Sequence, residues 1–129
     1  MNKIETRTAV ITLFEPAIVW ESFKKGVRID AEDIQENIAA SLKLTGGMRH
    51  SAVLDARDRG VSITQKAMQY GSSNEVIKDR IATAHLTTSM GGKLIGNYFL
   101  KFFMPKINNH MFSDEKEALK WIRGFAETK

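Results

Sequence analysis

A chain of 129 residues with a net charge of +4 has the size of one domain, and its composition excludes several classes of protein. Without cysteine it can form neither a disulfide framework nor a thiolate zinc site. Its 19 basic residues are interspersed with 15 acidic ones instead of forming a stripe, so we expect no nucleic-acid partner.

The first segment of the chain favours a cytoplasmic location. Residues 1–20, "MNKIETRTAVITLFEPAIVW", lack the basic and then apolar regions of a signal peptide. No window approaches the roughly 18 apolar residues that a membrane span needs. We therefore expect one cytoplasmic domain over residues 1–129, with no membrane span.

The first elements in chain order are two strands and a helix. Alternation over residues 4–14 predicts a strand that buries Ala9, Ile11 and Leu13, and residues 18–23 predict its hairpin partner after the turn at Pro16. Asp30 is the predicted N-cap of the helix, and Gly46 with Gly47 ends it. The apolar stripe of this helix is predicted at the following positions: Ile34, Ile38 and Leu42.

Helices and strands alternate in the rest of the chain. Strands are predicted over 50–56, 81–87 and 108–112, and helices over 64–70, from Ser73 to about 80, from Ser89 to Pro105, and from a cap at Ser113 onward. The buried stripe of the last helix is Ala118, Leu119, Ile122 and Phe125. The order β-β-α-β-α-β-α-β-α predicts an α/β domain with a mixed sheet of about five strands and about four helices.

Residues 89–106, "SMGGKLIGNYFLKFFMPK", begin like a phosphate-binding loop. The motif G-x-x-x-x-G-K-[ST] fails at two positions, because Thr87 replaces the first glycine and Leu94 replaces the hydroxyl residue. A glycine-rich turn that opens a helix remains, and such a helix start can attract an anion. We therefore expect no cofactor, and we predict a candidate ligand-facing loop made of Asp55, Ser89, Gly91, Gly92 and Lys93.

The remaining polar residues show no catalytic constellation. His50, His85 and His110 form no metal-binding spacing, so we expect no metal site. Asp55 ends a strand, where it can face a ligand or cap a loop by accepting backbone hydrogen bonds. We expect no enzymatic activity, and the alternative would use Asp55 or His85 as an acid or base.

The helix over 94–104 is apolar on more than one side, which predicts contacts with both the sheet and a further surface. A second copy of the chain can supply that surface, and we expect a homodimer. The candidate interface residues are Tyr98, Phe99, Phe102, Phe103 and Met104.

Three stretches carry a resemblance to a known superfamily: "LTGGMRHSAVLDAR" (44–57), "IGNYFLKFFMPK" (95–106) and "MFSDEKEALKWI" (111–122). The sequence resembles the SpoIIAA-like superfamily, which includes the sulfate-transporter and anti-sigma-factor-antagonist (STAS) domains. Within it, the sequence is most similar to small uncharacterised STAS/SEC14-type proteins of Bacteroidetes. The resemblance implies a small sheet with helices packed against it.

The resemblance also implies a position for a phosphoacceptor loop after the central strand. Anti-sigma antagonists carry D-S-[ST]-G after the central strand, with a serine that a partner kinase phosphorylates, whereas this chain has "LDARDRGVSITQKA". Ser62 and Thr64 are the hydroxyl residues near the phosphoacceptor position, and each can equally be a helix cap.

Two functional hypotheses follow. We favour a non-enzymatic regulatory module that contacts an unidentified protein partner. The alternative, suggested by the SEC14-type relatives, is a carrier of a small apolar molecule or lipid.

Overall fold

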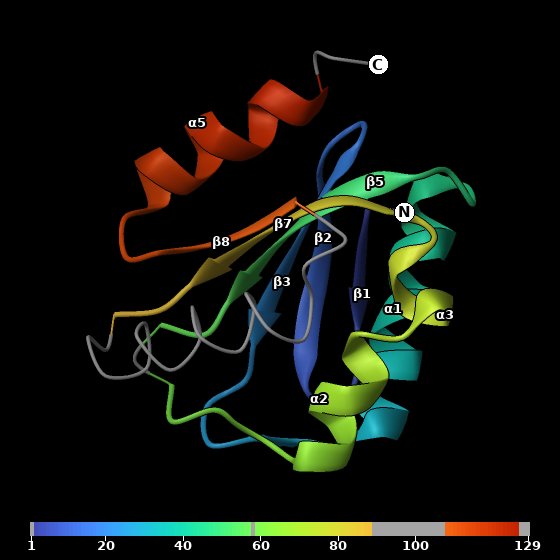
Figure 1. Ribbon diagram of the computed structural model, residues 1–129, viewed down its shortest axis with the longest axis vertical. Coiled ribbons are helices and arrows are strands. Elements are labelled where there is room, and N and C mark those ends of the chain that lie inside the picture. Colours follow the sequence, from blue (N-terminus) through green and yellow to red (C-terminus); the bar gives the residue numbers. More distant parts are fainter. Residues whose placement is uncertain (1, 58, 89–107, 127–129) are drawn as a thin grey trace.

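A computed structural model describes residues 2–57, 59–88 and 108–126 (Figure 1). The described strands are β1 (Lys3–Glu5), β2 (Ala9–Glu15), β3 (Ile18–Phe23), β4 (Arg28–Ile29), β5 (His50–Asp55), β6 (Ser62–Ile63), β7 (Arg80–Leu86) and β8 (Asn108–Phe112). The described helices are α1 (Ala31–Thr45), α2 (Gln65–Gly71), α3 (Asn74–Ile77) and α5 (Glu115–Ala126). No helix in these ranges is long and apolar enough to cross a membrane.

The main sheet is mixed, as predicted, and has six strands in the order β1-β2-β3-β5-β7-β8. β1, β2 and β3 pair antiparallel, whereas β3, β5, β7 and β8 pair parallel. β3 is therefore the strand at which the sheet changes from antiparallel to parallel pairing. Its side chains lie near the middle of the sheet, where helices cover both faces.

The N-terminal part of the chain differs from the prediction in one respect. The strand predicted over 4–14 is two strands, because the chain turns at residues 6–8 and folds back on itself. The Ala9 backbone N–H donates to Thr6 Oγ1 at 3.2 Å, and the Thr6 backbone N–H donates to the Ala9 carbonyl oxygen at 2.8 Å; both hydrogen bonds stabilise this turn. The predicted hairpin of β2 and β3 is present, with Ile11 opposite Glu21.

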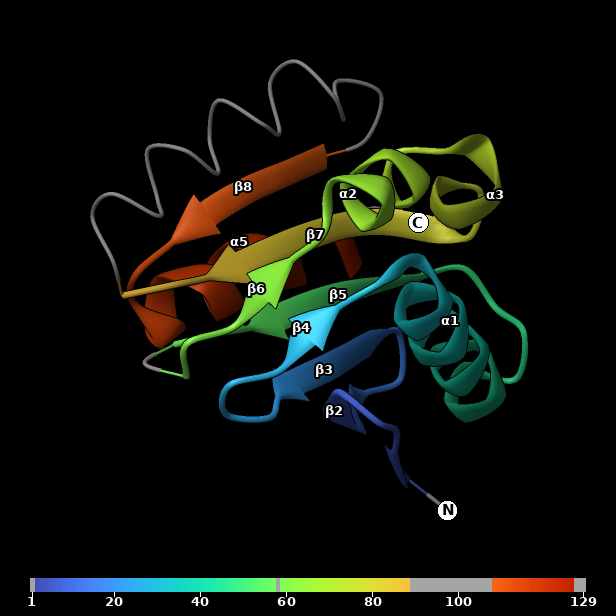
Figure 2. The same ribbon diagram turned by 90° about the horizontal axis from the view of Figure 1, so that it is seen from below.

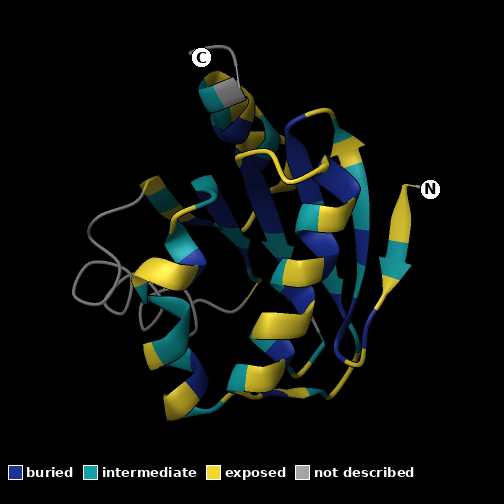
Figure 3. Ribbon diagram, turned by 90° about the vertical axis from the view of Figure 1, so that its right-hand side faces the viewer, coloured by how far each residue is buried: buried dark blue, intermediate teal, exposed yellow. Residues whose placement is uncertain are grey.

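α1 starts at the predicted cap but buries a different face. Asp30 and Asp33 form a capping box, and Gly46 ends the helix in the left-handed conformation with φ 66°. The face turned to the sheet carries Asn37 and Ser41, whereas the predicted apolar stripe is only partly buried (Figure 3). The Asn37 amide nitrogen donates to Thr8 Oγ1 at 3.1 Å, and the Thr6 hydroxyl bonds Asn37 Oδ1 at 2.6 Å.

α2 and α3 lie beside α1 on the same face of the sheet (Figure 2). α3 covers four residues, half the length of the helix predicted from Ser73. A two-stranded parallel ribbon, which the sequence did not predict, pairs β4 with β6 and leads the chain into α2.

α5 covers the opposite face of the sheet (Figures 1 and 2). Ala118 and Ile122 are fully buried against β3, β5 and β7, as the predicted stripe requires. The cap lies one residue later than predicted: Asp114, not Ser113, accepts the Glu117 backbone N–H at 3.2 Å. An acidic cap also interacts favourably with the positive end of the helix dipole.

Candidate functional site

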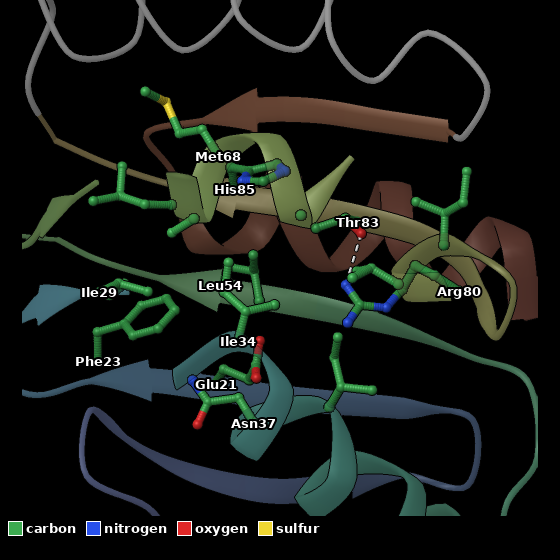
Figure 4. A pocket seen from close by; sticks show the side chains of 16 residues that line it. Glu21, Phe23, Ile29, Ile34, Asn37, Leu54, Met68, Arg80, Thr83 and His85 are labelled. Atoms are coloured by element: carbon green, nitrogen blue, oxygen red, sulfur yellow. Dashed lines mark hydrogen bonds between the residues drawn. The ribbon is translucent and has the colours of Figure 1, made fainter. Parts of the chain in front are cut away.

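A pocket of about 130 Å³ lies between the sheet and the helices α1, α2 and α3 (Figure 4). The lining is mainly apolar. The residues that line it are Glu21, Phe23, Ile29, Ile34, Asn37, Ile38, Leu54, Ile63, Ala67, Met68, Gly71, Val76, Ile77, Arg80, Thr83 and His85. Ile34 and Ile38, which the sequence assigned to the buried stripe of α1, are therefore partly exposed because they face this pocket.

Glu21 on β3 is the acidic side chain of the pocket. Val19, Glu21 and Phe23 alternate onto the α1 face of the sheet, so the strand places this carboxyl among apolar neighbours. Glu21 is 5% exposed, and within the described part of the chain it makes no hydrogen bond or ion pair. Burial raises the pKa of Glu21, and the positive charge of Arg80 partly opposes that increase.

β7 supplies the other polar groups. Arg80, Thr83 and His85 all line the pocket, and a register irregularity in the pairing with β5 lies between the positions of Arg80 and Thr83. Arg80 Nη1 donates to Thr83 Oγ1 at 2.9 Å (Figure 4). Burial lowers the pKa of Arg80, while the negative charge of Glu21 raises it.

His85 is neutral at physiological pH. Burial, assisted by the charge of Arg80, lowers its pKa to about 4. Its Nε2 is buried without a hydrogen-bond partner among the described residues. The imidazole therefore offers one unused polar atom at the edge of an apolar space.

The arrangement combines a few hydrogen-bonding groups with a lining that is mostly hydrocarbon. A guanidinium, a hydroxyl, an imidazole and a carboxyl face a space that is otherwise lined by aliphatic side chains. Small-molecule sites have this pattern of apolar walls with a few polar groups that fix orientation. Within the described ranges, no group of three or more histidines and carboxylates is placed to hold a metal ion.

Asp55, the strand-end residue singled out in the sequence, is not part of the pocket lining. It is 2% exposed, and its carboxylate accepts from Arg57 Nε at 3.0 Å, from Arg57 Nη2 at 2.8 Å and from the Arg57 backbone N–H at 3.2 Å. Arg59 Nη1 forms a further ion pair at 2.8 Å. Burial alone would raise the pKa of Asp55, but these partners outweigh it and lower the pKa to about 2.

The ion pairs around Asp55 connect two elements that are far apart in the sequence. Arg57 Nη2 also bonds Glu115 Oε1 at 3.0 Å, which joins the end of β5 to the first turn of α5. The carboxylate is thus held by local partners, which is the loop-capping role that the sequence allowed for it.

Ser62 and Thr64 lie on either side of Ile63, a pocket residue. Thr64 is the N-cap of α2, and its Oγ1 accepts the Ala67 backbone N–H at 3.1 Å. Ser62 is exposed on β6, and its backbone N–H donates to the Val27 carbonyl oxygen at 3.0 Å.

The other candidate residues lie outside the described ranges. They are Ser89, Gly91, Gly92 and Lys93 of the ligand-facing loop, and Tyr98, Phe99, Phe102, Phe103 and Met104 of the interface. Their roles stay predictions.

Sequence reasoning missed Glu21 and Arg80. The signal for Glu21 was present, because an acidic residue at the inward position of an alternating strand is unusual. Arg80 was assigned to the end of a helix, and only the early start of β7 brings it to the pocket.

Three comparisons with known proteins identify the fold and the family. The model of a family described as "Domain of unknown function (DUF7793)" matches residues 12–126. No curated protein matches the chain. The structure is similar to that of an uncharacterised protein of the DUF3478 family from Shewanella loihica PV-4, which has a SpoIIAA-like fold. The two structures superpose with a TM-score of 0.60, and the sequences are 11% identical. The similarity covers 94% of this chain and 90% of that one, and it confirms the predicted SpoIIAA-like fold.

Proposed function

We propose a binding function for this chain, which belongs to the DUF7793 family: it holds a small, largely apolar molecule in the pocket beneath α1, α2 and α3. The observation that carries the proposal is the carboxyl group of Glu21. It is buried in an apolar pocket and makes no hydrogen bond or ion pair with the described residues.

A carboxyl in this position costs stability. Burial disfavours the charged form of Glu21, as its raised pKa shows, and an aliphatic side chain would fill the same place without that cost. Perturbed titratable groups in pockets are concentrated at functional sites. A ligand that forms hydrogen bonds with Glu21 would compensate for the missing partners.

The size of the pocket limits the ligand. A cavity of about 150 Å³ is known to hold a benzene-sized molecule, and this pocket has about 130 Å³. The buried part of the ligand should therefore contain about six heavy atoms. This proposal corresponds to the carrier hypothesis drawn from the sequence. The regulatory protein partner and the homodimer stay predictions, because their interface residues lie outside the described ranges.

The test uses 1-hexanol as a probe and two glycine variants. At Gly71, at the end of α2, an added Cβ would lie 3.7 Å from Ile34 Cδ1, so Gly71→Leu would place its side chain at the pocket wall. At Gly124 on α5, an added Cβ meets nothing within 4 Å, which makes Gly124→Leu a matched control on the other face of the sheet.

We expect 1-hexanol to cause saturable shifts of the pocket amides in ¹⁵N-correlated NMR spectra of the protein and of Gly124→Leu. The same titration of Gly71→Leu should give little or no saturable shift. If the intact protein shows no saturable shift, or if Gly71→Leu binds as well as Gly124→Leu, the proposal is wrong.

A further inference from the structure

We propose that the ligand is a small monocarboxylic acid, whose carboxylate pairs with Arg80 while its hydrocarbon part lies among the aliphatic side chains of α1, α2 and α3 (Figure 4). This inference rests on the proposed function and adds the chemical class of the ligand. It follows from the kinds of hydrogen-bonding groups that the pocket leaves unused.

Arg80 and Thr83 supply hydrogen-bond donors to the pocket. The guanidinium of Arg80 has five N–H donors and uses one of them on a described side chain, that of Thr83. The Thr83 hydroxyl accepts this bond, so its own hydrogen can be donated elsewhere. A carboxylate offers two oxygens to such donors, and a planar guanidinium can bind both of them at once.

The protonation of Glu21 determines whether a ligand carboxylate can bind in the same pocket. Glu21 raises the pKa of Arg80 and Arg80 lowers the pKa of Glu21, but the two side chains form no ion pair within the described part of the chain. A ligand carboxylate would use the charge of Arg80 and leave Glu21 uncompensated in an apolar environment. Burial raises the pKa of Glu21, and a bound carboxylate would raise it further through like-charge repulsion, so we expect binding of the acid to favour proton uptake by Glu21, which then donates a hydrogen bond.

The remaining titratable group of the pocket does not compete for this proton. His85 faces the same space, and burial with the nearby charge of Arg80 keeps it neutral until the pH approaches about 4. The apolar part of the lining then accommodates a chain of about five or six carbon atoms.

The experiment compares three probes of matched chain length: hexanoate, 1-hexanol and hexylammonium. Each is titrated by NMR at about pH 6.5 into the folded protein. We expect hexanoate to bind at least tenfold more tightly than 1-hexanol, and hexylammonium to bind more weakly than both. Equal affinity for hexanoate and 1-hexanol, or tightest binding of hexylammonium, would overturn the inference while the proposed function stands. Failure of all three probes to bind would reject the proposed function itself.

Two variants test whether Arg80 binds the carboxylate of the ligand. Arg80→Gln should reduce hexanoate affinity at least tenfold and leave 1-hexanol affinity unchanged. The matched control is Arg49→Gln, because Arg49 is exposed and donates to the Arg80 carbonyl oxygen at 3.4 Å without lining the pocket. If Arg80→Gln does not fold, the comparison of the three probes on the unaltered protein still decides the question.

Glu21→Gln tests the coupled proton. In the unaltered protein, we expect hexanoate affinity to rise at least threefold as the pH falls from about 7.5 to about 5.5, because binding takes up a proton. Glu21→Gln should bind hexanoate at least as tightly as the unaltered protein at about pH 7.5 and should lose this pH dependence. A tenfold weaker affinity in Glu21→Gln, or an unchanged pH dependence, would contradict the inference.

Discussion

The ion pairs of Asp55 should make a measurable contribution to stability that depends on pH. Asp55 is buried between Arg57 and Arg59, and its pKa falls from the ordinary value of 3.8 to about 2 on folding. At about 1.4 kcal/mol per pKa unit, this shift corresponds to roughly 2–3 kcal/mol of folding free energy. Asp55→Asn keeps the shape of the side chain and removes the charge.

The direction of the pKa shift of Asp55 determines how its contribution to stability depends on pH. Because the folded pKa is the lower one, the unfolded chain binds more protons between about pH 2 and about pH 4, and the stabilisation is lost as the pH falls through that range. The contribution is complete near pH 7. About half of it should remain near pH 3, where the unfolded carboxyl is mostly protonated and the folded one is not.

Urea unfolding followed by circular dichroism measures this contribution. At about pH 7, Asp55→Asn should lower the free energy of unfolding by roughly 2–3 kcal/mol, and near pH 3 the difference should be about half as large. Glu75→Gln, which alters an exposed carboxylate on α3, is the control and should change stability by less than about 0.5 kcal/mol. A difference that does not change with pH, or one below about 0.5 kcal/mol at pH 7, would refute the reasoning. Asp55→Asn should also bind 1-hexanol normally, because Asp55 lies outside the pocket lining.

Further predictions concern a cap, the core and the oligomeric state. Thr64→Ala should lower the free energy of unfolding by about 1 kcal/mol, since the Ala67 N–H loses its acceptor at the start of α2, and an unchanged urea midpoint would contradict the capping role. Ile122→Ala should lower it by about 2–5 kcal/mol, because Ile122 is fully buried between α5 and the sheet; a loss below about 1 kcal/mol would show that the helix packs loosely. Light scattering at micromolar concentration should give about twice the chain mass of 14.5 kDa, and a species of 14.5 kDa alone would reject the predicted homodimer.

The sequence predicted the sheet and its flanking helices because their signals are local. Alternation in β2, the acidic residues at the start of α1 and the stop at Gly46 each depend on a few neighbouring residues, and the structure has all three. The hairpin of β2 and β3 could also be predicted, since its turn contains Pro16.

The face of α1 that packs on the sheet could not be predicted in the same way. Apolar periodicity identified Ile34, Ile38 and Leu42, but the face of the helix that packs on the sheet carries Asn37 and Ser41 together with Ala40 and Leu44. Asn37 is suited to this position because Thr6 and Thr8 supply hydrogen-bond partners from distant turns of the chain. Such pairings depend on tertiary structure, and no pattern within the helix indicates them.

The candidate site was missed for a related reason. Its polar groups come from β3 and β7, which are not neighbours in the sheet, and β5 with Leu54 lies between them. Arg80 is ordinary in its own segment of sequence, and the unusual inward position of Glu21 does not indicate its partner. Only the parallel order of the strands brings Glu21 and Arg80 to the same pocket.

The position of α5 also has a consequence during protein synthesis. This helix follows every strand that it covers, and it alone among the described helices covers that face of the sheet. While the chain emerges from the ribosome, no described helix therefore covers the apolar side chains of Ile18, Val53 and Ala84 until the segment 115–126 has been made. Exposed apolar strands of this kind promote aggregation in nascent chains. A premature stop before Glu115 should thus yield an insoluble product rather than a smaller folded domain.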